Sequence, residues 1–490
     1  MKVSALHSAL LGMLVSLPSL IPALEQHVFL TPPQPLSSHG VIHRFKFRDA
    51  ESLGGILSEA ESHALDIWQI RTDSSRFVDI YTPENFSALP LSLARLPHSS
   101  SNVWSDIPPS RSELSPSDWG LETLGNSTFH ASYHTQNDVD AFMLELRRLH
   151  PSLVTLLTLG HTAEEREMLG LKISKETGKK KLGFVIMGPQ HAREWVATST
   201  ALYIAHALLS DSSEPRSLSH LLDVYDFHII PSPNPDGYVH TWKSDRFWYK
   251  NRQIVGPQAK CIGIDMNRWA LFSRIKLQSY LLVLGTGYLS ISKLLRSIDT
   301  SSKGYKWKPE ADHPLIKANT KKEEPADPCS HWYPGHRAFE SPEVNNIANY
   351  ITKIGGVGKG AKGGVVAFLD LRSYGQMVAA PFSYKCNKFP KDAEFQMEAL
   401  HGAVQAAKSI HGTQFDTGTL CELLYRAPGN FLDYVYKIAN IKYAYAAFLR
   451  DTGTYGFSLP ASWIRPVGEE TAELVQYLGK FIAKQYGLAL

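Results

Sequence analysis

An apolar run followed by a helix-like segment constrains the fold of this chain more than any other feature. Residues Leu182–Met187 are apolar apart from one glycine, which is typical of a central strand buried on both faces. Residues Val196–Leu209 have the length and apolar content of a helix. The turn between them holds His191 and Glu194, whose side chains can reach one cation. Since open α/β sheets place their sites where strands end, this stretch predicts an α/β fold with a metal site.

Apolar runs of the same kind recur in the second part of the chain and alternate with segments of helical periodicity. They lie at residues 226–230, 365–371 and 443–449. An amphipathic helix follows Gly468 near the end of the sequence. Strands that alternate with helices are typical of a layered α/β fold. We therefore predict that residues 129–490 form a three-layer domain with a mixed β-sheet between helices.

The N-terminal part of the chain predicts a separate, smaller unit over residues 28–108. The expected strands are residues 41–47, 65–70 and 77–81, and the expected helices are residues 50–63 and 85–96. This order in under 100 residues is typical of a small α+β unit with an antiparallel sheet. The stretch from Ser99 to Asn126 is rich in Ser and Pro and predicts a linker, with a linker or activation segment assigned to residues 109–128.

Residues 269–303 fit neither pattern. The segment carries five basic residues and a single acid, Asp299, and its apolar residues are interrupted by Gly285 and Gly287. Three explanations remain open for it: a surface insertion, a helix that binds a partner, or a stretch that does not belong to the mature protein.

The composition limits the classes of function. The chain has 490 residues, enough for two or three domains, and a net charge of +3 with its basic residues dispersed. This pattern does not indicate nucleic-acid binding. No run beyond the N-terminus reaches the ~20 apolar residues of a membrane-spanning helix. We expect a globular monomer without a transmembrane anchor.

Several features indicate the secretory pathway. Residues 1–23 have a lysine, an apolar run and a Pro-Ala end, which predicts a signal peptide; a buried N-terminal helix is the alternative. Asn85 and Asn126 head glycosylation sequons. Four cysteines without metal-ligand spacing predict two disulfides, with three possible connectivities. The expected location is extracellular or vacuolar.

Ordered motifs along the second domain carry a family resemblance. They are His191-Ala192-Arg193-Glu194-Trp195, Asn234-Pro235-Asp236-Gly237-Tyr238, Gly263-Ile264-Asp265-Met266-Asn267-Arg268, Phe368-Leu369-Asp370-Leu371, Ser373-Tyr374, Tyr425 and Leu449-Arg450-Asp451-Thr452-Gly453. On these motifs the chain resembles the procarboxypeptidases of the carboxypeptidase A/B family of zinc metallopeptidases. The N-terminal unit resembles the inhibitory pro-domain of that family. The nearest likeness is to a fungal branch that is regarded as inactive and is linked to cell-wall organisation.

The resemblance implies zinc as the cofactor, held by three protein ligands. His191 and Glu194 match two of them, and Asp265 matches the carboxylate that orients the histidine. The family places the third ligand, a histidine, where this chain has Arg372. A guanidinium offers no lone pair to a metal, so zinc binding is placed in doubt. The alternative for His191 and Glu194 is a charged pair at the start of a helix.

Two further positions of the catalytic set depart from the family. The general base, a glutamate, is replaced by Phe448, which cannot take a proton. The arginine that stabilises the oxyanion is replaced by Tyr249, although a shift of one residue would allow Lys250 to serve. The resemblance therefore implies a catalytic set with no intact member.

The positions that grip the substrate are retained. Asn267 and Arg268 match the pair that binds the C-terminal carboxylate of a peptide, and Tyr425 matches the tyrosine that caps the bound residue. The remaining matches are Arg193 and Tyr374 at subsites, and Leu432 where side-chain preference is set. An apolar residue at that last position predicts an apolar or aromatic C-terminal residue. The alternatives are a structural ion pair for Arg268 and a core position for Tyr425.

The resemblance also implies the disulfide pairs Cys261–Cys329 and Cys386–Cys421. Two functions from different classes follow. The first is a carboxypeptidase-like protein that is inactive as an enzyme and binds the C-termini of peptides or proteins. The second is an active zinc carboxypeptidase that removes apolar C-terminal residues, which would require an aberrant or mis-spliced sequence here.

Overall fold

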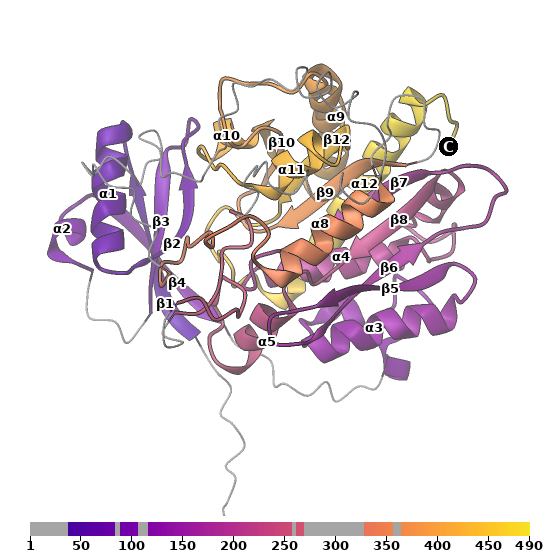
Figure 1. The fold of residues 1–490 in the computed structure, drawn as a ribbon, viewed down its shortest axis with the longest axis horizontal. Coiled ribbons are helices and arrows are strands. Elements are labelled where there is room, and N and C mark those ends of the chain that lie inside the picture. The colour runs from indigo at the N-terminus through magenta and orange to yellow at the C-terminus, as the bar shows by residue number, and fades with distance from the viewer. Residues whose placement is uncertain (1–37, 84–88, 106–115, 257–260, 269–327, 356–363) are drawn as a thin grey trace, which may run out of the picture. The chain divides into compact units, whose positions relative to one another are not determined.

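The structure is a computed structural model that describes residues 38–83, 89–105, 116–256, 261–268, 328–355 and 364–490. The predicted signal peptide, the sequon at Asn85 and the segment 269–303 lie outside the described residues. The described residues form one unit. That unit contains two β-sheets, one of four strands and one of eight (Figure 1).

The four-stranded sheet belongs to the N-terminal part of the chain. Its strands are β1 (Ser38–Lys46), β2 (Asp66–Arg71), β3 (Phe77–Pro83) and β4 (His98–Ser105), in the order β2-β3-β1-β4 with every pair antiparallel. Helix α1 (Ala50–Ser62) begins after Asp49, which accepts a hydrogen bond from the amide of Ser52 in a capping box. The prediction of a small α+β unit with an antiparallel sheet is confirmed.

Two details of this unit differ from the sequence-based expectation. Residues 99–105, predicted to be linker, belong to strand β4, because pairing with β1 outweighs the weak strand preference of a serine run. Helix α2 spans only Leu91–Ala94 and begins after Pro90, whose ring restricts the residue before it. Trp119, within the predicted linker, is 1% exposed and packs in the core of the following domain.

The eight-stranded sheet is mixed, with the order β11-β10-β12-β9-β7-β8-β6-β5. Its strands are β5 (Val154–His161), β6 (Glu167–Ile173), β7 (Leu182–Met187), β8 (Tyr225–Ile230), β9 (Val365–Arg372), β10 (Met377–Ala380), β11 (Asp416–Thr419) and β12 (Tyr443–Phe448). The central strands β12, β9, β7 and β8 run parallel to one another. Their carboxyl ends therefore meet at the same edge of the sheet.

Helices pack on both faces of this sheet (Figure 1). They are α3 (Gln136–Leu149), α4 (Trp195–Ala207), α5 (Pro235–Lys243), α8 (Pro342–Ile354), α9 (Ala393–His411), α10 (Leu420–Leu423), α11 (Phe431–Lys437) and α12 (Ile464–Gln485). Strand β7 illustrates the layering, because Phe184 and Ile186 enter one hydrophobic cluster while Val185 and Met187 enter the other. The three-layer prediction is confirmed.

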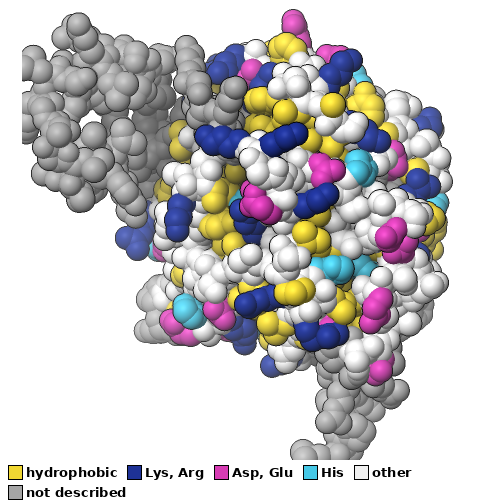
Figure 2. Space-filling view, turned by 90° about the vertical axis from the view of Figure 1, so that its right-hand side faces the viewer, with side chains coloured by type: hydrophobic (Ala, Val, Ile, Leu, Met, Phe, Trp, Pro, Cys, Tyr) yellow, Lys and Arg dark blue, Asp and Glu magenta, His cyan; other side chains and the backbone are white. Residues whose placement is uncertain are grey.

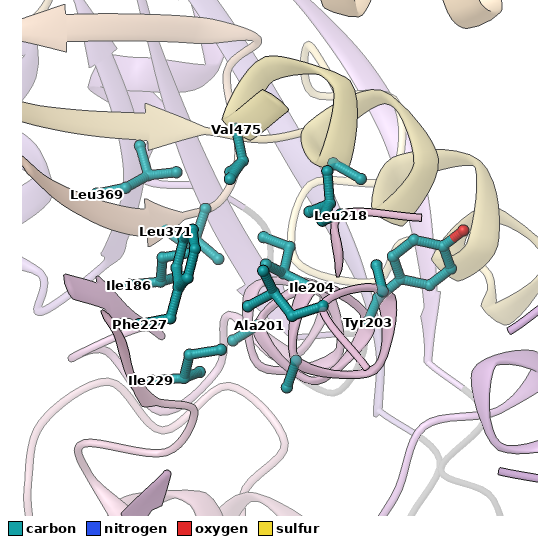
Figure 3. Close-up of a cluster of buried hydrophobic side chains, with 14 of the residues drawn as sticks. Ile186, Ala201, Tyr203, Ile204, Leu218, Phe227, Ile229, Leu369, Leu371 and Val475 are labelled. Carbon is teal, nitrogen blue, oxygen red and sulfur yellow. The ribbon is translucent and has the colours of Figure 1, made fainter. Parts of the chain in front are cut away.

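The larger cluster joins the sheet to helices α4, α9 and α12 (Figure 3). Ala201 and Ile204 of α4 and Ile186 and Leu369 of the sheet belong to this cluster, and all four are fully buried. Burying such a side chain contributes about 1.5–3 kcal/mol. Every residue of α4 is buried, which fixes the helix start, and with it the turn that contains His191.

Both disulfides that the resemblance implies are present, Cys261–Cys329 and Cys386–Cys421. Over the described ranges, no helix is long and apolar enough to cross a membrane. Acidic and basic side chains are interspersed on the face drawn in Figure 2, as the dispersed charge of the sequence predicts. Asn126, which heads the second sequon, is exposed.

Candidate functional site

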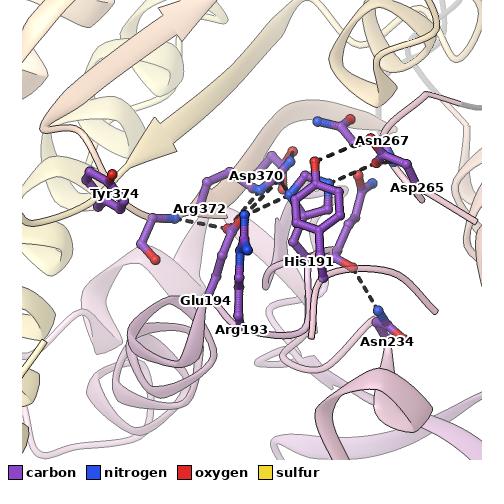
Figure 4. A network of polar contacts seen from close by, with 12 residues as sticks. His191, Arg193, Glu194, Asn234, Asp265, Asn267, Asp370, Arg372 and Tyr374 are labelled. Carbon is purple, nitrogen blue, oxygen red and sulfur yellow. Dashed lines mark hydrogen bonds and ion pairs between the residues drawn. The ribbon is translucent and has the colours of Figure 1, made fainter. Parts of the chain in front are cut away.

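Three parallel strands bring the candidate site residues to one edge of the sheet. His191 lies in the turn after β7, and Glu194 is the residue immediately before α4. Arg372 is the last residue of β9 and Phe448 the last residue of β12, and the two are direct partners in the register of these strands. The sheet therefore determines which side chains meet (Figure 4).

Arg372 turns inward and pairs with the residues that match the first two metal ligands. Its Nε donates to Glu194 Oε2 at 3.0 Å and its Nη2 donates to Glu194 Oε1 at 3.1 Å, a two-bond contact between guanidinium and carboxylate. The Nη2 atom also contacts His191 Nδ1. The side chains of Arg372 and Glu194 are each 2% exposed. We refer to His191, Glu194 and Arg372 as the Arg372 cluster.

His191 is held from its other side by Asp265 and Tyr249. Its Nε2 lies 2.9 Å from Asp265 Oδ1, so a proton on Nε2 completes that hydrogen bond. The Tyr249 ring stacks on the imidazole with 3.8 Å between the ring centroids, and its hydroxyl donates to Asp265 Oδ2 at 3.3 Å. The ring of His191 therefore has a fixed orientation, with Nδ1 directed at Arg372 and Glu194.

The electrostatics of the cluster keep the Glu194 carboxylate charged. Burial alone would raise the pKa of Glu194, but the charges and hydrogen bonds of Arg372 and His191 outweigh it and lower that pKa to about 2. Burial likewise opposes ionisation of Asp265, and Arg268 with His191 lowers its pKa below the ordinary value. The pKa of Asp370, which lies 3.6 Å from Arg372 Nη1, is raised by burial to about 7.

These residues do not fit a zinc ion. A catalytic zinc needs three protein ligands with lone pairs directed at it. Within the described part of the chain, no group of three or more His, Cys, Asp and Glu side chains could hold a metal. Arg372 stands where a third ligand would be needed, and it has only donors to offer. Its guanidinium is hydrogen-bonded to Glu194, so the carboxylate is already engaged.

The resemblance assigns catalytic roles to two further positions, 448 and 249, whose surroundings the structure describes. The Phe448 ring lies 5.9 Å from the guanidinium carbon of Arg372 and has no group that accepts a proton. Tyr249 is engaged with Asp265. Lys250 donates from Nζ to the Ser330 carbonyl at 2.9 Å and is not among the described residues that line the cavity. The arrangement supplies neither a general base at 448 nor a cation at 249.

A second cluster in the same cavity contains Asn267, Arg268 and Tyr425, which we call the Arg268 cluster. Arg268 donates from Nη2 to the Tyr425 hydroxyl at 2.6 Å and from Nη1 to the Asn267 carbonyl at 2.9 Å. Its guanidinium also lies 5.5 Å from the centroid of the Trp332 ring. All three members line the cavity. This guanidinium thus donates to a phenol and a peptide carbonyl and lies near two aromatic rings.

The N-terminal sheet contributes one wall of the cavity. Residues Ile67–Ile70 of β2 line it together with both clusters. Asp66 of the same strand accepts from Arg193 Nη1 at 2.6 Å, and Arg193 is 1% exposed. The cavity measures about 80 Å³, which is room for a few water molecules. Asp66 has no signal in the sequence, because an acid that starts a strand looks like any solvated residue.

The other two predicted subsite residues, Tyr374 and Leu432, differ from each other in whether they line the cavity. Tyr374 lines the cavity, and its hydroxyl donates to the buried Asp79 of β3 at 2.8 Å. Leu432 is fully buried in the smaller hydrophobic cluster and is not among the described cavity-lining residues. Trp332 lines the cavity and was missed, because it follows a cysteine in a stretch without periodic pattern.

The mixed sheet, the flanking helices and the residues gathered at its strand ends define a carboxypeptidase-type α/β protein. The family model described as "Zinc carboxypeptidase" matches residues 139–474. This match covers more than half of the chain, so the protein belongs to the zinc carboxypeptidase family.

Curated relatives and solved structures agree with this assignment. The "Metallocarboxypeptidase A-like protein" of Trichophyton verrucosum is 32% identical over 369 residues, 74% of each chain. The "Inactive metallocarboxypeptidase ECM14" of Paracoccidioides brasiliensis is 28% identical over 487 residues, 91% of this chain and 73% of the relative. The crystal structure of thrombin activatable fibrinolysis inhibitor matches with a TM-score of 0.70 at 24% identity, covering 91% of this chain and 99% of that one. This structural likeness concerns the fold.

Proposed function

We propose that this protein binds the C-terminal carboxylate of peptides or proteins in its carboxypeptidase-type cavity and does not hydrolyse them. The observation that carries the proposal is the contrast between two arginines of one cavity. Arg372 is paired with Glu194, which leaves no opening for a catalytic metal. Arg268 donates its hydrogen bonds to a phenol and a peptide carbonyl, and it lines the cavity. A planar guanidinium is suited to a carboxylate.

The loss of hydrolysis has independent support. A relative that aligns with 91% of this chain bears the name inactive metallocarboxypeptidase. Deprotonation of a metal-bound water needs both a metal and a base, and positions 372 and 448 hold Arg and Phe. In place of chemistry, the site offers a positive charge next to aromatic rings, Trp332 and Tyr425. Such surroundings favour an apolar or aromatic C-terminal residue beside the carboxylate.

Isothermal titration of the full chain tests the binding step. The ligand is a short N-acetylated peptide ending in Phe, compared with the same peptide as its C-terminal amide. We expect amidation and Arg268→Ala each to weaken binding by about 10–100-fold, as the loss of a charge-assisted contact worth ~1.5–3 kcal/mol predicts. Arg147→Ala, at an exposed position of α3, is the matched control and should bind like wild type. Equal affinity for acid and amide would contradict the proposal.

Incubation of the same peptide with the full chain and added zinc tests the second step. The peptide should remain intact in chromatography. Release of the terminal Phe would instead establish the alternative, an active zinc carboxypeptidase. Sequencing the transcript from residue 269 through residue 448 then shows whether the 269–303 segment, Arg372 and Phe448 are all genuinely encoded.

We also propose a location in the secretory pathway, either outside the cell or in the vacuole. Two disulfides support an oxidising compartment. The exposed Asn126 supports glycosylation there. Cell fractionation, with a mass shift on enzymatic deglycosylation that Asn126→Gln abolishes, distinguishes these compartments from the cytosol. A role in cell-wall organisation is part of this proposal through the resemblance to the fungal branch.

A further inference from the structure

The Arg372 guanidinium lies where lone pairs from two other side chains converge. Both oxygens of Glu194 accept hydrogen bonds from it, and Nδ1 of His191 contacts the same Nη2 nitrogen. Lone pairs that converge in this way in a metalloprotein face a metal ion. We propose that Arg372 is a built-in cation that replaces the metal, and that the exchange of this one residue for histidine gives the chain a binding site for a divalent cation such as zinc.

The Nη2 atom of Arg372 lies beside both His191 and Glu194. His191 Nδ1 and Glu194 Oε1 lie 2.9 Å apart. Arg372 Nη2 donates to Glu194 Oε1 and also contacts His191 Nδ1. One nitrogen of the guanidinium therefore lies beside both atoms, in the place where a metal ion would contact them.

The charges of Arg372 and Glu194 balance each other. Arginine stays protonated in proteins, so the pair of Arg372 and Glu194 has no net charge. A zinc site of the kind that the resemblance implies has two positive charges on the metal and two negative charges, one on a ligand and one on the general base. Phe448, the strand partner of Arg372, removes the second negative charge at the position where the metal's second positive charge has been lost. The two departures from the family compensate each other.

Both side chains of this ion pair are buried. Because the side chains of both Arg372 and Glu194 are 2% exposed, a zinc ion could bind Glu194 only by breaking the two hydrogen bonds between this carboxylate and a buried, charged guanidinium. Such a displacement is strongly unfavourable. The Asp370 carboxylate, 3.6 Å from Nη1, adds a further hold on the guanidinium. The wild-type site should thus reject divalent cations rather than bind them weakly.

Zinc content and thermal unfolding of the full chain test this inference. After dialysis against zinc and then buffer, we expect wild type to keep less than about 0.1 equivalent and to unfold at the same temperature with and without zinc. Arg372→His should keep about one equivalent. Its unfolding temperature should fall below that of wild type without zinc, rise on zinc addition and fall again with a chelator. Arg372→His/Glu194→Gln is the matched control and should lose the zinc response.

Two outcomes would overturn the inference. One is stoichiometric zinc in wild type, a measurement that needs no variant and no peptide. The other is a folded Arg372→His chain without zinc binding. If this variant folds only in the presence of zinc, that result supports the inference, because the metal then supplies the missing cation. Peptide affinity does not enter the test, so failure here and failure of the proposed function are distinguishable.

A coupling measurement tests the compensation between Arg372 and Phe448. We expect Phe448→Glu to lower the unfolding temperature more in wild type than in zinc-loaded Arg372→His, where the metal can neutralise the added carboxylate. Phe431→Glu is unsuitable as a control, because Phe431 is a core residue. Phe389→Glu, at an exposed position in the loop before α9, is the suitable control. Equal shifts in both backgrounds would contradict the compensation.

Discussion

The Arg372 cluster and the Arg268 cluster place the same kind of side chain in one cavity with opposite results. Arg372 is joined to a carboxylate by two hydrogen bonds and to an imidazole by a third. Arg268 is joined to a phenol and a peptide carbonyl, and it forms no ion pair with a carboxylate among the residues that the structure describes. The charge of the partner, rather than the residue type, decides whether an arginine serves the fold or remains able to bind a ligand.

Removing the guanidinium from the Arg372 cluster should have the largest effect. Arg372→Met leaves the buried Glu194 carboxylate without its counter-ion, which costs about 3–5 kcal/mol of unfolding free energy. Urea unfolding at neutral pH measures it. The double variant Arg372→Met/Glu194→Gln is the control, because it removes both charges and should recover most of the loss. Equal losses in the single and double variants would show that no buried ion pair is present.

The second largest effect is expected from acid, which should destabilise wild type through the Arg372 cluster. The pKa of Glu194 is lowered from 4.5 to about 2, so the stabilisation is complete above pH 4.5 and is lost as the pH falls through 2. At 1.36 kcal/mol per unit this amounts to ~3 kcal/mol. In Arg372→Met, burial instead raises the pKa of Glu194, and this loss should vanish. Unfolding free energies of both chains, measured between pH 7 and pH 2, test this expectation. Parallel pH profiles of the two chains would contradict it.

The smallest expected effect lies in the Arg268 cluster. Tyr425→Phe removes the acceptor of one Arg268 hydrogen bond and should cost ~0.5–1.5 kcal/mol of stability. Tyr434→Phe removes a phenol bonded to Thr352 outside the cavity and is the matched control. Only the change at Tyr425 should alter the affinity for a peptide with a free C-terminus, as measured by titration. If both variants bind alike, Tyr425 is a core residue.

The fold was predictable where patterns are long. The run of six at β7 and the helix after it predicted the layered sheet, because strands buried on both faces are apolar throughout. Four strands of the sheet, β5, β6, β10 and β11, were missed. Strands β10 and β11 have four residues each, too few for a periodic signal. Strand β4 was missed because its serines are stabilised by pairing with β1, a contact that lies far along the chain.

The sequence predicted which residues lie at the site, but it did not predict the hydrogen bonds between them. The motif around Asp370 located Arg372, and the motif after Phe448 located the partner strand. From the sequence, arginine at a ligand position predicts only that a metal is opposed. In the structure the guanidinium points inward and donates to both oxygens of Glu194. This contact depends on side-chain geometry, which the spacing of residues in the sequence does not encode. The contact of Asp66 with Arg193 joins two sheets and is equally invisible in the sequence.

The ion pair between Asp66 and Arg193 has a consequence for any measured affinity. Strand β2 belongs to the same chain as the cavity that it lines, so a peptide that took the place of Ile67–Ile70 would compete with a tethered segment. Short tethers give effective concentrations on the order of millimolar. The apparent affinity for such a peptide would be reduced by the fraction of time that the strand occupies its place. A weak dissociation constant for the full chain would then reflect this internal competition as well as the strength of the Arg268 contact.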